Sequence, residues 1–312
     1  MLMKQVIEIF DLLDCPEASG SSVSKRLSEK GVPENHITVK LITGDRGSTD
    51  FIRIVVPGSQ GKSAGGSAPT LGILGRLGGL GARPAVTGFV SDGDGAMVAL
   101  SAAFKLWDMH LRGDVLPGDV IITTHICPNA PTQPHEPVPF MGSPVDMTIM
   151  NQMEVDDEMD AILSIDTTRG NHVVCHNGYA LSPTVKQGYI LRVSEDLLNI
   201  MQVVSGIHPV TFPITTQDIT PYGNGLHHIN SILQPSTATC VPVVGVAITS
   251  ETAVPGCATG ASMPLSAEGA ARFAVETAKA FTEGKCSFYD PKEFDILTET
   301  YGVMTHLQKG GQ

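Results

Sequence analysis

The sequence is poor in the features that mark secreted and membrane proteins. Its 312 residues include only six cysteines, none in a Cys-x-x-Cys pair, and 5% aromatic residues. Scattered cysteines in a chain of this length do not form the disulfide framework of a short secreted domain, so we expect reduced thiols. No run reaches the roughly 18 apolar residues that cross a bilayer, and the first residues lack a signal-peptide cleavage pattern. These absences predict a cytoplasmic protein with no membrane partner.

Positive charge is also scarce. Lys and Arg number 20 against 32 Asp and Glu, which gives a formal net charge of −12. Proteins that bind nucleic acids meet the phosphates with clustered Lys and Arg, and the sequence has no basic run, so we expect no nucleic-acid partner. An apolar fraction of 42% and a charged fraction of 17% are typical of globular proteins. The composition therefore predicts one folded domain over residues 1–312.

The hydrophobic pattern alternates between helical and strand spacing along the chain. Helices are predicted over 3–14, 21–30, 94–111 and 195–204. A further helix of small residues is predicted after the loop 57–66 and extends to about Leu80, and another begins at Ser266 as its N-cap. Strands are predicted over 36–43, 50–56, 84–90, 119–123, 159–165, 173–175, 188–193 and 239–249. This alternation predicts an α/β three-layer sandwich with a mostly parallel mixed sheet.

A glycine-rich loop, Gly58-Ser-Gln-Gly-Lys-Ser63, follows one of the predicted strands. It is not a Walker loop, because that motif requires a glycine where this chain has Val56. The loop has two alternative interpretations, a short anion-binding nest or a structural turn. In the first alternative, Ser59 and Lys62 contact the substrate.

Two aspartates, Asp92 and Asp94, precede and open the predicted helix over 94–111. Their surroundings resemble the start of a calcium loop, but the twelfth position holds Ala103 instead of a glutamate. A carboxylate at a helix N-terminus also stabilises the helix dipole, so Asp94 has a structural interpretation as a cap. We expect Asp92 to be functional and Asp94 to be a candidate substrate contact.

Polar residues also follow two other predicted strands. His125 and Cys127 come after the strand over 119–123, and Asp166 ends the strand over 159–165. The carboxyl ends of parallel strands are the usual ligand-binding edge of such a sheet. A histidine there suits metal binding or proton exchange, and a buried carboxylate needs a hydrogen bond, an ion or a metal. The alternative for His125 and Cys127 is a structural role in the loop.

Two further residues are candidate substrate contacts. His228 belongs to the pair His227-His228, of which at most one side chain would serve a given site. Cys257 lies in another glycine-rich loop after a predicted strand. The pair His135-Glu136, in a proline-rich loop, is a further candidate. The sequence has no GxSxG, HExxH or GxGxxG motif.

The order of these segments resembles the architecture of zinc-dependent aminopeptidases, the phosphorylase/hydrolase-like fold, over about residues 50–282. In that architecture an aspartate opens a long helix, as Asp92 does here, and a later strand ends in a ligand aspartate, as at Asp166. The resemblance implies that both are metal ligands. By position, His125 takes the place of a further ligand.

The sequence departs from that family pattern in three places. The His-x-Asp ligand motif is missing near Gly58–Gln60, and the paired glutamates are missing at His125–Cys127. The final histidine is also missing, with Glu251 or Cys257 nearest to its place. The resemblance therefore does not imply a standard two-zinc site.

A second resemblance covers nearly the whole chain. The run GDVIITTHICPNAP, from Gly118 to Pro131, and the segment Ser164–Gly170 are similar to the bacterial family DUF1177, a domain of unknown function. This similarity implies no established reaction.

Two functional hypotheses remain open at this point. The first is a metal-dependent hydrolase of a small amide or peptide-like substrate, in which Asp92, His125 and Asp166 hold zinc or manganese. The metal would polarise a carbonyl and activate water, with His125 and Cys127 as catalytic residues. The second is a degenerate peptidase-like protein that binds a small ligand without catalysis. A third, thiol chemistry at Cys127 or Cys257, lacks a recognisable base.

We also expect the protein to form a homo-oligomer, because many enzymes of this class assemble symmetrically.

Overall fold

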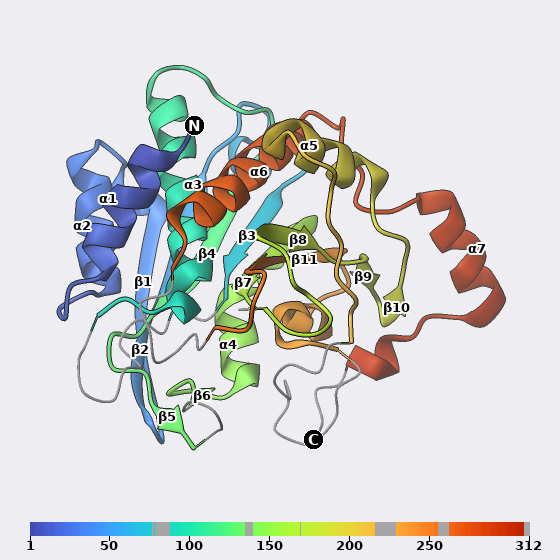
Figure 1. The fold of residues 1–312 in the computed structure, drawn as a ribbon. Coiled ribbons are helices and arrows are strands. Elements are labelled where there is room, and N and C mark those ends of the chain that lie inside the picture. The colour runs from blue at the N-terminus through green and yellow to red at the C-terminus, as the bar shows by residue number, and fades with distance from the viewer. Residues whose placement is uncertain are drawn as a thin grey trace.

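The computed structural model describes residues 1–76, 78, 88–134, 140–168, 170–215, 229–254 and 262–308. Within these ranges a nine-stranded sheet lies between layers of helices (Figure 1). The helices are α1 (Met3–Leu13), α2 (Gly20–Glu29), α3 (Asp94–Leu111), α4 (Met147–Glu154), α5 (Glu195–Ser205), α6 (Pro264–Thr282) and α7 (Pro291–Tyr301). Shorter 3-10 turns are η1 (Glu34–His36), η2 (Lys62–Ala64), η3 (Ser91–Gly93), η4 (Ser231–Thr237) and η5 (Thr305–Gln308).

The strands of the sheet come from both halves of the chain. They are β1 (Ile37–Gly44), β2 (Gly47–Val56), β3 (Leu71–Gly75), β4 (Val120–Ile126), β7 (Ala161–Thr167), β8 (Gly178–Leu181), β9 (Val185–Lys186), β10 (Tyr189–Ile190) and β11 (Val243–Thr249). A separate two-stranded sheet pairs β5 (Thr132–Gln133) with β6 (Phe140–Met141).

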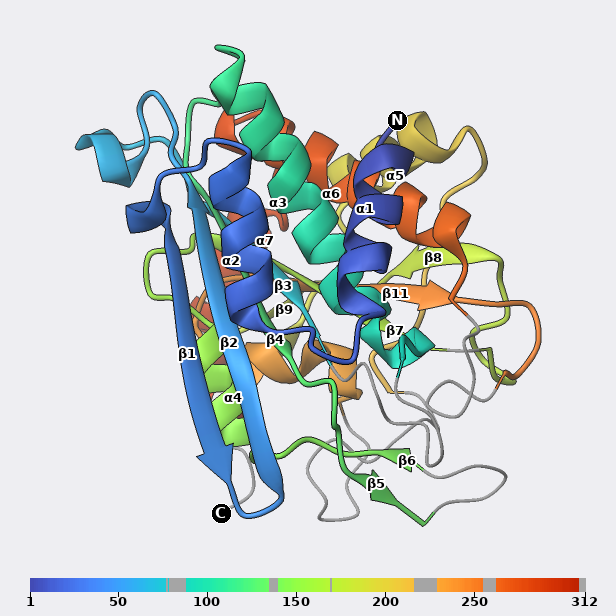
Figure 2. The same cartoon turned by 90° about the vertical axis from the view of Figure 1, so that its left-hand side faces the viewer.

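The strands follow the order β1-β2-β4-β3-β7-β11-β9-β10, and β8 also pairs with β11. The four central strands β4, β3, β7 and β11 are parallel, whereas β2 runs antiparallel to β4 and β8 antiparallel to β11. The long β1–β2 hairpin forms one side of the sheet (Figure 2). Because the central strands point the same way, their carboxyl ends meet at one edge, where such sheets bind ligands.

Helices cover both faces of the central strands. On one face α3 and α6 pack on the sheet, with α1 against them and α5 against α6 (Figures 1 and 2). On the other face α4 and η4 cover β2, β7 and β11. The helix α7 stands apart from the sheet at one end of the molecule (Figure 1).

Most of the elements predicted from periodicity are confirmed, with ends shifted by a few residues. The helices over 3–14, 21–30, 94–111 and 195–204 correspond to α1, α2, α3 and α5. The strands over 36–43, 50–56, 119–123, 159–165 and 239–249 correspond to β1, β2, β4, β7 and β11. In each of these segments one consistent hydrophobic period extends over the whole element.

The small-residue helix predicted before Leu80 is wrong, because part of that segment forms the central strand β3. Two glycines explain the difference, since they let other elements approach the strand closely. A Cβ at Gly72 would lie 2.3 Å from Met159 Sδ, and one at Gly75 would lie 2.6 Å from the Gly95 carbonyl oxygen of α3. A strand buried on both faces has no alternation, so its sequence does not distinguish it from a buried helix.

Other local predictions also need correction. α6 begins at Pro264, so Ser266 lies inside the first turn, and proline suits that start because the first helical residues need no N–H partner. Residues 173–175 form no strand, since the Asn171 side chain accepts the N–H groups of Val173 and Val174 in a turn. Of the strand over 188–193 only β10 exists. Of the strand over 84–90, only residues 88–90 are described, and they are not a strand.

Among the described helices, none combines the length and apolar character that a membrane span needs.

Replacing Gly75 by Ala should destabilise the protein. The added Cβ would lie 2.6 Å from the Gly95 oxygen and 2.8 Å from Ala99 Cβ. Overpacking of this kind costs about 1–3 kcal/mol, which a urea unfolding curve would show as a lower free energy of unfolding. The control is Gly269→Ala in α6, where the nearest atom is Tyr179 Cε1 at 3.3 Å, and its change should stay within about 1 kcal/mol. A Gly75→Ala protein as stable as wild type would contradict the close packing.

Candidate functional site

Three strands deliver polar side chains to the same level of the sheet. Gly75 of β3 pairs with Thr124 of β4 on one side and with Ile165 of β7 on the other. The next residue along each strand is therefore level with the others, which places Arg76 between His125 and Asp166. The N–H of Arg76 donates to the Ile165 oxygen at 2.7 Å, so the parallel pairing continues to this level.

The side chain of Arg76 ends on Glu154, the last residue of α4. Arg76 Nη1 lies 2.7 Å from Glu154 Oε2, and Arg76 Nη2 donates to Asn151 Oδ1 at 2.5 Å. Arg76 is only 2% exposed and Glu154 is fully buried. A buried carboxylate and a buried guanidinium each cost several kcal/mol to desolvate, so each depends on the other.

The second oxygen of the Glu154 carboxylate binds His125. His125 Nδ1 lies 2.7 Å from Glu154 Oε1, and His125 Nε2 accepts the backbone N–H of Gly78 at 3.2 Å. A nitrogen that accepts an N–H carries no proton, so His125 is the neutral tautomer with its proton on Nδ1. A metal ion at Nε2 would have to displace the hydrogen bond from Gly78. Because both ring nitrogens already have partners, the structural alternative for His125 is favoured.

Three carboxylates gather near the same edge of the sheet. η3, which contains Asp92, packs against β7, which contains Asp166. Asp94 accepts the hydroxyl of Ser262 at 2.6 Å, and Asp166 accepts the N–H of Thr167 at 2.7 Å. Asp94 and Asp166 are both buried. The structure therefore brings the predicted aspartates to one region around the start of α3.

The predicted metal site does not fit this geometry. β3 lies between β4 and β7, so His125 and Asp166 are two strands apart, at about 10 Å, with Arg76 between them. A metal shared by His125 and Asp166 would compete with a guanidinium for the same position. Within the described part of the chain, no group of three His, Cys, Asp or Glu residues is arranged to hold a metal ion.

Cys127 lies in an apolar cluster with Val90, Ala130 and Met141. It is 1% exposed, and its Sγ lies 3.6 Å from the Ser48 carbonyl oxygen. Burial raises the pKa of the Cys127 thiol to about 11, so the thiol stays protonated at neutral pH. Because the reactive form of cysteine is the thiolate, this environment favours a structural role.

The glycine-rich loop lies at the opposite edge of the sheet, because β2 is antiparallel to β4. Its backbone N–H groups already bind a carboxylate of the protein itself: Asp119 accepts from Gly58 at 2.7 Å and from Ser63 at 2.8 Å. The loop is thus an anion-binding turn whose anion is internal.

The same placement separates Ser59 and Lys62 from the other candidates. The Ser59 N–H donates to the Leu116 oxygen at 2.8 Å, and Lys62 Nζ pairs with Asp160 at 2.8 Å. The seven residues of β4 put this loop about 20 Å from the carboxyl ends of the strands. Ser59 and Lys62 therefore cannot line one pocket with Asp94, and their predicted contact with a substrate stays a prediction.

Several candidates lie outside the described residues. These are His227, His228, His135, Glu136 and Cys257. Their predicted roles stay predictions.

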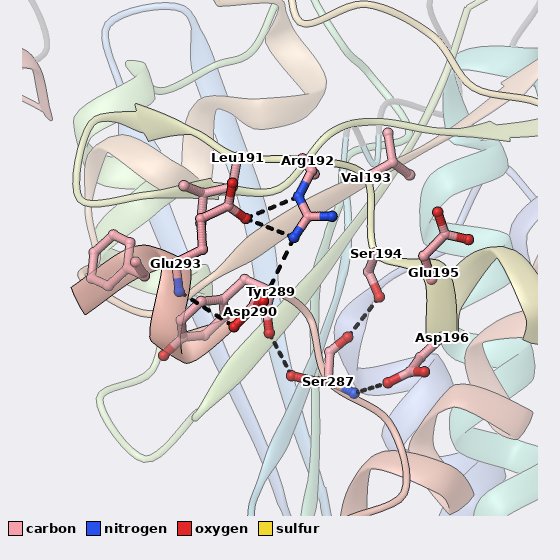
Figure 3. A pocket seen from close by; sticks show the side chains of 11 residues that line it. Leu191, Arg192, Val193, Ser194, Glu195, Asp196, Ser287, Tyr289, Asp290 and Glu293 are labelled. Carbon is pink, nitrogen blue, oxygen red and sulfur yellow. Dashed lines mark hydrogen bonds and ion pairs between the residues drawn. The ribbon is translucent and has the colours of Figure 1, made fainter. Parts of the chain in front are cut away.

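A hollow of about 170 Å³ lies away from the strand ends, at the attachment of α7 (Figure 3). Its polar groups are engaged with one another: Arg192 pairs with Glu293 at 2.9 Å, and the hydroxyl of Ser194 donates to the Ser287 oxygen at 2.6 Å. The N–H of Ser287 donates to Asp196 at 2.8 Å. The Arg192–Glu293 pair holds α7 to the segment before α5, and the two bonds of Ser287 hold the segment before α7 to the start of α5.

Sequence reasoning missed Arg76 and Glu154. The signal for Arg76 was a charged residue directly after the apolar run of Leu71–Gly75, but that run resembled a small-residue helix. The signal for Glu154 was weaker, since it ends the short segment Met147–Glu154, which no strong motif marks.

A family model described as "Protein of unknown function (DUF1177)" matches residues 40–311. The chain belongs to this family. The resemblance found in the sequence is therefore confirmed. The comparison of this DUF1177 protein with curated proteins found no match.

The fold of this DUF1177 protein is similar to that of known enzymes. The bottromycin maturation enzyme BotP matches with a TM-score of 0.53 and 15% identity, covering 90% of this chain and 70% of BotP. An Acidobacteriales bacterium glutaminyl cyclase matches with a TM-score of 0.52 and 9% identity, covering 91% and 94%. The cytosol aminopeptidase from Coxiella burnetii gives a TM-score of 0.49 at 13% identity, covering 89% and 68%. The predicted fold class, an α/β protein with a mixed sheet of this type, is confirmed.

Replacing Glu154 by Gln in this DUF1177 protein should strongly reduce its stability. The change leaves the Arg76 guanidinium buried without a counter-charge, and breaking a buried pair typically costs about 3–5 kcal/mol. Chemical denaturation measures the loss. The control is Glu158→Gln, which removes a carboxylate that pairs with Arg53 at 2.9 Å but is 62% exposed. An exposed ion pair contributes at most about 1 kcal/mol. An equal loss of unfolding free energy in the two variants would therefore contradict the burial of the Glu154–Arg76 pair.

Proposed function

We propose that the carboxyl ends of β4, β3 and β7 form a binding site for a small amide or peptide-like compound. The proposal is supported by the carboxylates of this region: Asp94 and Asp166 are buried, and η3, which contains Asp92, packs against β7. Amide N–H groups and a free amino group are donors, and carboxylates are strong acceptors for both. A glutaminyl cyclase and a bottromycin maturation enzyme share the fold, which supports a ligand of this class.

The Arg76–Glu154–His125 network supports a preformed site. Arg76 balances the charge of Glu154, and His125 is neutral, so the network is compact and has no net charge. Its three side chains are all at most 2% exposed. A binding site on a rigid base loses little conformational entropy when a ligand binds, which favours affinity for small compounds.

Hydrolysis by a metal-dependent reaction is a second proposal. It is favoured by one observation, the packing of η3 against β7, which brings Asp92 and Asp166 to the same region. With His125 bound to Glu154 and Gly78, two of the three predicted ligands for zinc or manganese remain. We therefore derive no metal-dependent step for this site.

The test of the binding proposal is a titration of the protein with dipeptides and amino-acid amides, followed by calorimetry. Binding should weaken at least about tenfold in Asp166→Asn, because an amide replaces a charged acceptor. The control is Lys62→Ala, at the opposite edge of the sheet, which should bind as wild type does. Equal weakening in both variants, or no binding of any compound of this class, would count against the site.

The same compounds separate binding from hydrolysis. Mass spectrometry after incubation with added zinc or manganese should show the compounds intact if the protein is a binding protein. Metal-dependent turnover that is lost in Asp166→Asn and kept in Lys62→Ala would support the hydrolase proposal instead.

A further inference from the structure

The side chain at the middle of the edge formed by the carboxyl ends of β4, β3 and β7 is a cation, the guanidinium of Arg76. Arg76 directly follows β3, between the strand that carries His125 and the strand that carries Asp166. Its guanidinium is buried, and its nitrogens bind Glu154 Oε2 at 2.7 Å and Asn151 Oδ1 at 2.5 Å. The sulfur of Met147 is 3.6 Å from Nη2.

The groups that surround the guanidinium are donors that metal ions use. A carboxylate oxygen and an amide oxygen suit hard divalent ions such as manganese. His125 is bound to the same Glu154 carboxylate. In metal sites, hydrogen-bonding partners that do not touch the metal orient the metal-binding side chains in this way. What stands at the centre of these donors is a positive charge that cannot dissociate.

We propose that the Arg76 guanidinium takes the place of a divalent cation between β4 and β7. The carboxylate of Glu154 then needs no metal to balance its charge, and the base of the site stays assembled whatever metal ions are available. The proposal concerns the cation and does not depend on the ligand proposed above.

A purely structural salt bridge is the competing explanation. Such pairs are often replaceable by apolar residues without loss of stability, so stability alone does not explain a buried charge directly after the central strand. A structural pair predicts nothing about metals. The cation hypothesis predicts that removing the guanidinium leaves a cavity whose oxygen donors bind a metal ion.

The experiment measures Mn²⁺ binding to the full-length protein by calorimetry and by thermal unfolding in excess MnCl₂. Arg76→Ala should bind Mn²⁺ at least about tenfold more tightly than wild type and gain thermal stability from it. Arg76→Lys, which keeps a positive charge at this position, should behave as wild type does. The double variant Arg76→Ala with Glu154→Gln should lose the gained binding, because the carboxylate is gone.

Each outcome decides the proposal. Equal Mn²⁺ affinity of wild type and Arg76→Ala would overturn it, as would a gain that survives in the double variant. If Arg76→Ala does not fold in metal-free buffer, refolding in MnCl₂ should restore its circular dichroism spectrum. Failure of Mn²⁺ to restore the fold would also overturn the proposal.

Discussion

The site depends on one carboxylate that has no access to water. Glu154 is fully buried at the end of α4 and lies 2.7 Å from both Arg76 Nη1 and His125 Nδ1. Its position would be unfavourable without these two partners, because a helix C-terminus repels negative charge and a dry interior does not solvate it. The bond from the Thr123 hydroxyl to the Glu154 backbone oxygen, at 2.8 Å, also ties the end of α4 to β4.

The orientation of several elements follows from this carboxylate. It ties the end of α4 to His125 of β4 and to Arg76 after β3, and it holds the imidazole of His125 so that Nε2 accepts from Gly78. Gly78 also accepts the N–H of Cys127 at 3.0 Å, so Gly78 lies beside the end of β4. The carboxylates near the start of α3 then lie next to a neutral, rigid base. The carboxylates near the start of α3 are thus distinct from the charged groups of Arg76 and Glu154, which hold this edge of the sheet together.

The sequence was sufficient for the elements with a clear period. The helix over 94–111 and the strand pair over 36–56 carry long apolar patterns, and both exist as expected. The strand-end location of His125 and Asp166 was also predictable, since each belongs to the end of an apolar run, whereas Asp92 lies in η3 and not at the end of a described strand. These are local properties, which the order of residues determines directly.

The rest required the three-dimensional arrangement. Which strand lies between two others is a matter of sheet order, and β3 is inserted between β4 and β7 although it precedes both in sequence. For this reason His125 and Asp166 are separated by Arg76, which no spacing in the chain reveals. The partner of His125 is 29 residues away on α4, a helix with no strong motif. The place of the glycine-rich loop also depends on the sheet, because the antiparallel direction of β2 puts the loop at the opposite edge.

The protonation of His125 tests the bonding of Glu154 most directly. It can be observed by long-range ¹H–¹⁵N NMR of the imidazole ring at neutral pH. A carboxylate at Nδ1 and an N–H donor at Nε2 predict a neutral ring with a proton on Nδ1 and a bare Nε2. An imidazolium signal, or a proton on Nε2, would contradict the bonding of Glu154 on which the arrangement of the site depends.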